Sequence, residues 1–149
     1  MPPLSQAPIP LSSHLGGSVI DPIIIEPSTR RSDNDCAICC LKMLLGVDYS
    51  AITAAIPKRA KPSKNGLTVR QMRAVAKRLG FDLRSRSTPP EDDEIGILDL
   101  EKDHDPDGHV AMFARGLVYD STLGLLYTDI GAYSLITGWT VIGFLWRES

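Results

Sequence analysis

The sequence predicts an α+β domain in which helices pack on a mostly antiparallel sheet. Apolar residues recur with helical spacing between residues 36 and 79, whereas short β-rich runs separated by turn residues occupy residues 81–146. Helices first and strands afterwards is the order expected of an α+β domain. At 149 residues, with 43% hydrophobic and 23% charged residues, the chain has the size and composition of one globular domain.

The first 27 residues differ in composition from the rest. They are rich in Pro, Ser and Gly, which predicts an extended or flexible arm over residues 1–27 ahead of a single domain at residues 28–149. No apolar run approaches the roughly 18 residues that span a bilayer, so no membrane partner is expected. The three cysteines, two of them adjacent, make a poor disulfide framework and favour a reducing, cytoplasmic setting.

Three helices are expected in the first half, each with a start or stop signal. The first follows a polar run that ends at a cysteine, and the other two follow Ser and Thr, which are good N-caps. The expected helices run from Cys36 to Leu45, from Ser50 to Ile56 before Pro57, and from Thr68 to Leu79 before Gly80.

Six strands are expected after Gly80, separated by turn residues such as the run Asp105–Gly108. The expected strands are Phe81–Arg86, Ile95–Leu100, Val110–Ala114, Leu117–Tyr119, Leu125–Ile130 and Trp139–Trp146.

Cys36 stands at the start of the first expected helix. Backbone N–H groups and the helix dipole at such a position favour a thiolate, the reactive form of cysteine. His109 opens a later apolar run, and Asp120 follows it by 11 residues. A cysteine, a histidine and a carboxylate in this order suggest a thiol hydrolase, with Asp129 as the rival to Asp120 for the third position.

These residues resemble those of the papain-like cysteine peptidases, and most of all the small bacteriocin-processing peptidase domains of exporters and their phage relatives. The resemblance rests on Asp35-Cys36, Leu41, Met43-Leu44, Asn65-Gly66-Leu67-Thr68 and Gly108-His109, and it extends over about residues 30–146. It implies a papain-like fold, with the helix that carries Cys36 packed on the sheet, and a catalytic group of Cys36, His109 and Asp120.

The chain departs from the family pattern near the oxyanion hole, the site that binds the negative oxygen of the tetrahedral intermediate. Ala37 stands where the family has Gly, and Arg30 stands where the family has a Gln. The resemblance then leaves Asn34 or Arg30 as the side-chain oxyanion donor, beside the backbone N–H of Cys36. It implies a peptide or protein substrate and no cofactor.

Two other uses of the cysteines are less well supported. Cys36 and Cys39 have the spacing of a redox Cys-x-x-Cys motif, but a polar loop rather than a strand precedes them. Zinc binding with His104 and His109 would need Cys39 and Cys40 on one side of a helix, where adjacent residues diverge. We therefore expect no metal, and we assign Cys39 and Cys40 to the core.

Charge is distributed unevenly along the chain. Residues 58–86 hold ten basic residues and one acid, whereas residues 91–107 hold nine acids and one lysine. Arg70, Arg73 and Lys77 would share one face of the third helix and could bind an anionic partner. The sequence thus predicts a cysteine hydrolase that cleaves a peptide, isopeptide or related amide bond; the alternative is a papain-like, non-catalytic binding or regulatory module with a basic face.

Overall fold

The structure, a computed structural model, describes residues 36–57, 67–122 and 124–148. The predicted arm over residues 1–27 and the oxyanion candidates Arg30 and Asn34 lie outside these residues. The described chain forms helices α1 (Cys36–Leu45), α2 (Tyr49–Ala55), α3 (Val69–Arg78) and α4 (Ile130–Thr137), and strands β1 (Leu83–Arg86), β2 (Ile95–Lys102), β3 (Asp105–Ala114), β4 (Leu117–Asp120), β5 (Leu125–Tyr127) and β6 (Thr140–Arg147).

The first three helices form where the sequence predicts them. Thr68 caps α3 through a capping box, in which its side chain accepts from the Gln71 amide and the Gln71 side chain accepts from the Thr68 amide. The prediction that Ser50 caps α2 is wrong, because Ser50 lies inside that helix. Asp48 occupies the N-cap position, without a hydrogen bond from its side chain to the helix.

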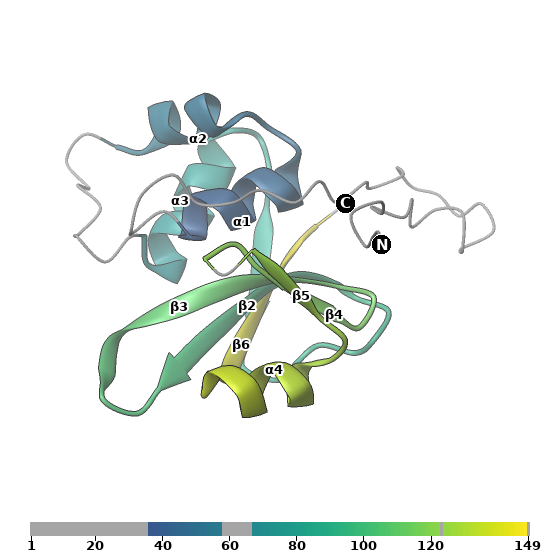
Figure 1. Cartoon of the computed structure of the whole chain (residues 1–149). Helices are drawn as coiled ribbons and strands as arrows, with labels where there is room; N and C mark the ends of the chain where they lie inside the picture. The colour runs from purple at the N-terminus through teal and green to yellow at the C-terminus, as the bar shows by residue number, and fades with distance from the viewer. Residues whose placement is uncertain (1–35, 58–66, 123, 149) are drawn as a thin grey trace.

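The strands form one antiparallel sheet in the order β1-β6-β2-β3-β4-β5. Helices α1, α2 and α3 lie on one side of it, and α4 lies on the other (Figure 1). Alternate strand residues enter two separate clusters: Ile97, Met112 and Leu145 pack with the three helices, while Leu98, Phe113 and Phe144 pack with Tyr133 of α4. This architecture confirms the predicted α+β class.

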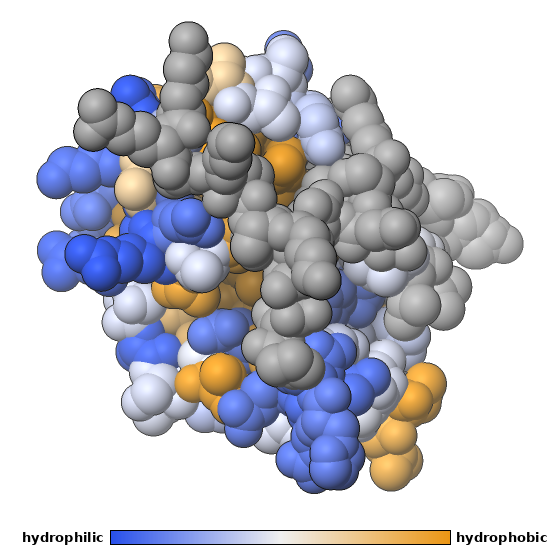
Figure 2. Space-filling model, turned by 90° about the vertical axis from the view of Figure 1, so that its left-hand side faces the viewer, coloured by the Kyte–Doolittle hydropathy of each residue, from blue (hydrophilic) through white to orange (hydrophobic). Residues whose placement is uncertain are grey.

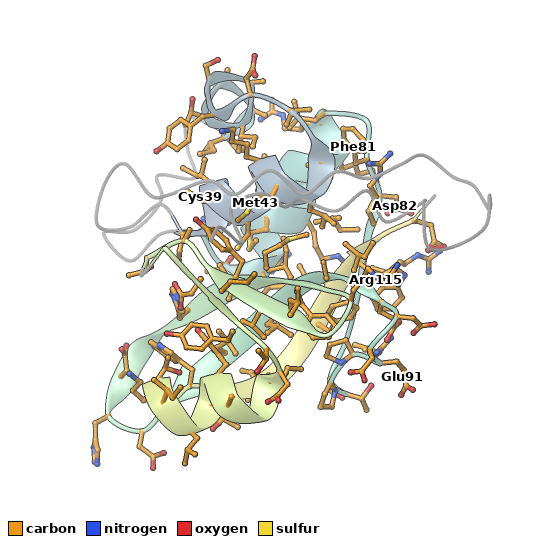
Figure 3. All side chains as sticks on the ribbon, turned by 45° about the vertical axis from the view of Figure 1, so that its right-hand side comes forward. Cys39, Met43, Phe81, Asp82, Glu91 and Arg115 are labelled. Carbon is orange, nitrogen blue, oxygen red and sulfur yellow. The ribbon has the colours of Figure 1, made fainter. Side chains whose placement is uncertain are left out.

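Helix α1 is almost wholly buried because its sequence is apolar on all sides. Cys39, Cys40 and Leu41 are each 0% exposed. Figure 3 shows Cys39 and Met43, one helical turn apart, on α1 next to the sheet. The surface in Figure 2, by contrast, is largely hydrophilic, with hydrophobic residues exposed between the polar ones.

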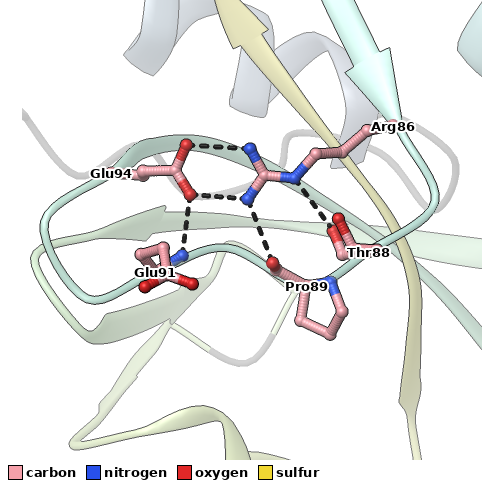
Figure 4. A network of polar contacts seen from close by, with 5 residues as sticks. All are labelled: Arg86, Thr88, Pro89, Glu91 and Glu94. Carbon is pink, nitrogen blue, oxygen red and sulfur yellow. Dashed lines mark hydrogen bonds and ion pairs between the residues drawn. The ribbon is translucent and has the colours of Figure 1, made fainter.

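The connection between β1 and β2 is held by one side chain. The Arg86 guanidinium forms a two-pronged pair with the Glu94 carboxylate and donates to the carbonyls of Thr88 and Pro89 (Figure 4). The same carboxylate accepts from the Glu91 amide, and these bonds lower the pKa of Glu94 to about 2. Arg86 from the basic stretch is thus paired with Glu94 from the acidic stretch.

Helix α4 is the main element that the sequence analysis missed, since residues 125–130 were expected to form one strand. Strand β5 ends at Tyr127, and α4 begins after the N-cap Asp129 and ends at Gly138, whose φ of 84° is left-handed. In the described part of the chain, no single helix is long and apolar enough to cross a membrane; α1 and α2 reach that length and composition only when taken together, as a pair bent by 113°.

Candidate active site

Cys36 is the first residue of α1, and that helix packs against β3. Apart from Lys42, the residues of α1 that follow Cys36 are all buried, from Ala37 at 2% exposed to Leu45, so the start of the helix is fixed by the core. Cys36 itself is only partly buried. The thiol is therefore anchored through its helix while its residue remains partly exposed.

His109 lies within β3, and Asp120 is the last residue of β4. Strand β3 begins at Asp105, so the predicted turn over residues 105–108 is wrong; the chain turns earlier, where His104 has a φ of 67°. The β3–β4 hairpin folds the two strands together and joins His109 Nε2 to Asp120 Oδ2 at 2.8 Å. Asp120 is 1% exposed, which makes it a buried carboxylate.

Cys36 lies near enough to the His109 ring to contribute to its pKa, both as a hydrogen-bonding partner and through its charge. Because Nε2 is engaged by Asp120, Nδ1 is the ring nitrogen left for the thiol. Burial lowers the pKa of His109, but the hydrogen bonds and charges of Asp120 and Cys36 outweigh burial and raise that pKa to about 9. The imidazole is thus held in its protonated form at neutral pH.

Asp120 is fixed by three donors. Its Oδ2 accepts from the Tyr133 hydroxyl at 2.7 Å as well as from His109, and its Oδ1 accepts from the Thr122 amide at 2.9 Å. Burial alone would raise the pKa of Asp120, but the bonds from His109, Tyr133 and Thr122 lower it below the ordinary value. The hydrogen bonds therefore favour the ionised carboxylate despite its burial.

A tryptophan ring packs against the histidine and is itself covered by a lysine. The Trp139 ring lies 5.1 Å from the His109 ring, tilted by 30°, and Lys102 Nζ sits 4.4 Å from the centre of the Trp139 ring. Sequence reasoning did not single out Tyr133 or Trp139. The signal was present in Asp129 and Gly138, which mark the start and end of the helix that carries Tyr133 and precedes Trp139.

The rival residues occupy other places. The Asp129 side chain accepts from the Ala132 amide at 2.6 Å and so serves as the N-cap of α4. His104 lies exposed in the turn between β2 and β3. Cys39 and Cys40 are core residues, as expected. The pKa of Cys40 is raised well above its ordinary value, chiefly because the thiol is buried. Within residues 36–57, 67–122 and 124–148, no group of three His, Cys, Asp or Glu residues could hold a metal ion.

Comparison with known proteins points to one family. Residues 26–93 match the model of the Peptidase C39 family; this span contains Cys36 but ends before His109 and Asp120. No curated protein matches the sequence significantly.

The fold is similar to that of two solved peptidase domains. One is from Streptococcus ComA, a bi-functional ABC transporter involved in a quorum sensing pathway, with a TM-score of 0.61 and 15% identity over 80% of this chain and 95% of that one. The other, from Streptococcus mutans ComA, has a TM-score of 0.55 and 14% identity over 82% of this chain and 98% of that one. The family match and the shared fold confirm the predicted resemblance to papain-like, exporter-linked peptidase domains, and the class of enzyme that they support is a cysteine peptidase.

Proposed function

We propose that the protein is a cysteine hydrolase that cleaves a peptide, isopeptide or related amide bond with Cys36, His109 and Asp120. The observation that carries the proposal is that His109 is hydrogen-bonded to the buried Asp120 carboxylate and that its ring also interacts with Cys36, so that both groups raise its pKa. Neither Cys36 nor Asp120 is adjacent to His109 in sequence, so it is the fold that brings the three side chains together.

The reaction follows from the roles of these groups. The Cys36 thiolate attacks the carbonyl carbon, and the oxygen of the tetrahedral intermediate takes the negative charge. His109 protonates the leaving amine as the carbon–nitrogen bond breaks, which leaves an acyl thioester on Cys36. His109 then takes a proton from water, whose oxygen attacks the thioester, and the carbon–sulfur bond breaks to release the carboxylic acid and to restore the Cys36 thiolate beside the protonated ring.

Asp120 keeps the imidazole oriented and stabilises its positive charge, and it does not itself take up the proton. The backbone N–H of Cys36, with Asn34 or Arg30, is the expected set of donors to the oxyanion. Loss of one such donor lowers the rate by about a hundredfold or more.

Selective alkylation tests the nucleophile without knowledge of the substrate. Iodoacetamide at mildly acidic pH should modify Cys36 in preference to the buried Cys39 and Cys40, as located by peptide mass mapping. His109→Ala should slow this modification strongly, because the thiolate loses its cationic partner. His104→Asn is the matched control: that histidine is exposed, and Asn tolerates its left-handed backbone.

Hydrolysis of a pooled library of internally quenched peptides tests the activity itself. Cys36→Ala should abolish turnover, because no other group on the path can form the acyl intermediate, and His109→Ala should reduce it nearly as far. A non-catalytic binding module, the alternative function, predicts no turnover in the wild type and no preference for Cys36 in alkylation. Those two results together would refute the hydrolase.

A further inference from the structure

A groove of about 500 Å³ lies between α3 and β1 and is not part of the Cys36 group. Arg70, Arg73 and Lys77 line it from the helix, and Asp82 and Leu83 line it from the strand side. Figure 3 labels Asp82 just before β1, beside Phe81.

The three basic residues share one side of α3 because they are three and four positions apart in sequence. The opposite side of the helix carries Met72, Val75 and Ala76, each 0% exposed, which fixes the rotation of α3 against the core. The capping box at Thr68 fixes the start of the helix. The basic side chains are thus presented on a rigid element.

Strand β1 stands at one end of the described sheet and pairs with β6 alone. The Asp82 carbonyl points toward β6, where it accepts from the Glu148 amide at 2.8 Å. Because carbonyls alternate along a strand, the Leu83 carbonyl points toward the groove, and Arg73 Nε donates to it at 3.2 Å. The outer edge of β1 therefore runs beside the basic side chains.

The groove carries an excess of positive charge. Three cations face one carboxylate, and that carboxylate, Asp82, also lies 3.9 Å from Arg84 outside the groove. Arg70 and Lys77 are both exposed at the surface. An occupant with two or more negative groups on an extended backbone would match this arrangement.

We propose that this groove binds an extended acidic peptide segment, with its carboxylates on Arg70 and Lys77 and its backbone along β1. A strand edge accepts a peptide by main-chain pairing, and basic side chains beside it select acidic residues. A nucleic acid fits less well, since none of the described residues that line the groove is aromatic and could stack on a base. The inference does not depend on the proposed hydrolase activity.

Fluorescence anisotropy with two labelled hexapeptides tests the proposal. One alternates Glu with Val, and the other has Gln in place of Glu. The Glu peptide should bind more tightly, and its affinity should fall with salt because the contacts are exposed. Arg70→Gln/Lys77→Gln should weaken binding by about tenfold, a change of about 1.4 kcal/mol. Arg73 is left unchanged because it holds the Leu83 carbonyl.

The matched control is Lys42→Gln/Arg78→Gln, which removes one lysine and one arginine outside the groove. The affinity of this control variant for the Glu peptide should stay within about twofold of the wild-type affinity, since only screened long-range charge is lost. Circular dichroism should show that both double variants are folded, and alkylation of Cys36 should be unchanged in both.

Three results would overturn the assignment. Equal affinity for the Glu and Gln peptides would remove the role of charge. Tighter binding of a single-stranded oligonucleotide, lost in Arg70→Gln/Lys77→Gln, would point to a nucleic acid. Self-association in sedimentation that disappears in the same variant would assign the groove to the acidic residues 91–107 of a second copy.

Discussion

The protonation of His109 depends on two neighbours from different elements, Cys36 on α1 and Asp120 on β4. Its pKa in the folded protein, about 9, lies above the ordinary value of 6.5. The imidazolium therefore persists through neutral pH, and its contribution to stability is fully present below pH 6.5 and is lost as pH rises through 9. We expect Cys36-dependent turnover to fall on the alkaline side near pH 9.

Asp120→Asn tests this dependence, because it removes the negative charge and keeps the shape. The His109 pKa, followed by NMR of the ring protons, should decrease, and the alkaline limb of turnover should move with it. Some activity should remain, because packing still orients the ring. An unchanged His109 titration in this variant would show that Asp120 does not control the histidine.

Tyr133 has a specific part in holding Asp120. Its hydroxyl is buried and donates to the oxygen that also accepts from His109. We expect Tyr133→Phe to lower the free energy of unfolding by about 1.5–3 kcal/mol, the usual worth of a hydrogen bond to a charged group. It should also raise the pKa of Asp120, which then has one donor fewer.

Tyr127→Phe is the control for Tyr133→Phe. The Tyr127 ring packs on Tyr133 with the two centroids 5.1 Å apart, and the same oxygen atom is removed. Among the described residues, however, the donors to the Asp120 carboxylate are His109, Thr122 and Tyr133, and Tyr127 is not one of them. Urea unfolding and the pH profile of Cys36 alkylation should both respond to Tyr133→Phe and not to Tyr127→Phe. Equal responses would make Tyr133 a packing residue only.

The individual site residues differ in how far the sequence could predict them. Cys36 stands out because a polar run ends and an apolar run begins at that residue. His109 stands out because an apolar strand follows it directly. Asp120 could not be separated from Asp129, since both follow strands. Only the structure distinguishes a carboxylate that receives a histidine from one that caps a helix, because both tasks need the same chemical group.

At the scale of elements, α4 depends on its first residue. Asp129 accepts from the Ala132 amide, one of the N–H groups at the helix start that lack a partner within the helix. Asp129→Ala should lower the free energy of unfolding by about 1 kcal/mol. Tyr133 lies one turn further along α4 and donates to Asp120, so the alkylation rate of Cys36 should change slightly. The pKa of His109 measured by titration should stay the same.

Asp48→Ala is the matched control for Asp129→Ala. Asp48 occupies the same N-cap position in α2, but its side chain makes no capping hydrogen bond. Its replacement should therefore change stability by much less in urea unfolding. A loss equal to that of Asp129→Ala would mean that helix-end charge, and not the hydrogen bond, accounts for the effect.

The helices near the N-terminal side were predictable because their signals are local. Each boundary is marked by nearby residues, without any distant contact. The polar run before Cys36 marks the start of α1, Thr68 with Gln71 marks the start of α3, and Gly80 follows its end. Helix α4 was missed because its eight residues, Ile130–Thr137, are mostly apolar or β-favouring and follow a short strand directly. Leu135 is 86% exposed there, so burial does not follow the sequence pattern.

At the scale of the whole molecule, the described parts of the two strongly charged stretches are in contact. Arg86 from the first pairs with Glu94 from the second, and Arg78 points to the Ala55 carbonyl, away from the groove. Charge counts along the sequence could not predict this, because pairing depends on where the β1–β2 connection turns. Of the described basic residues in the first stretch, Arg70, Arg73 and Lys77 line the groove.

The candidate site joins the two halves of the molecule, since Cys36 comes from the helices and His109 and Asp120 come from the sheet. The sheet separates two hydrophobic clusters, one under α1–α3 and one under α4, and its strands contribute to both. We therefore expect the clusters to unfold together in one two-state transition. Met72→Ala in the first and Leu98→Ala in the second should each lower the free energy of unfolding by about 2–5 kcal/mol.

Two probes can test this shared transition in urea. Both tryptophans, Trp139 and Trp146, pack against the cluster under α4, so fluorescence reports that side of the sheet. Far-UV circular dichroism reports chiefly α1–α3, because they hold most of the described helical residues. The two midpoints should coincide in the wild type and shift together in each variant, and alkylation of the buried Cys40 should begin at the same urea concentration. If Met72→Ala moved the dichroism midpoint and left the fluorescence midpoint in place, the helices would be a separate unit, and the alignment of Cys36 with His109 would depend on their docking alone.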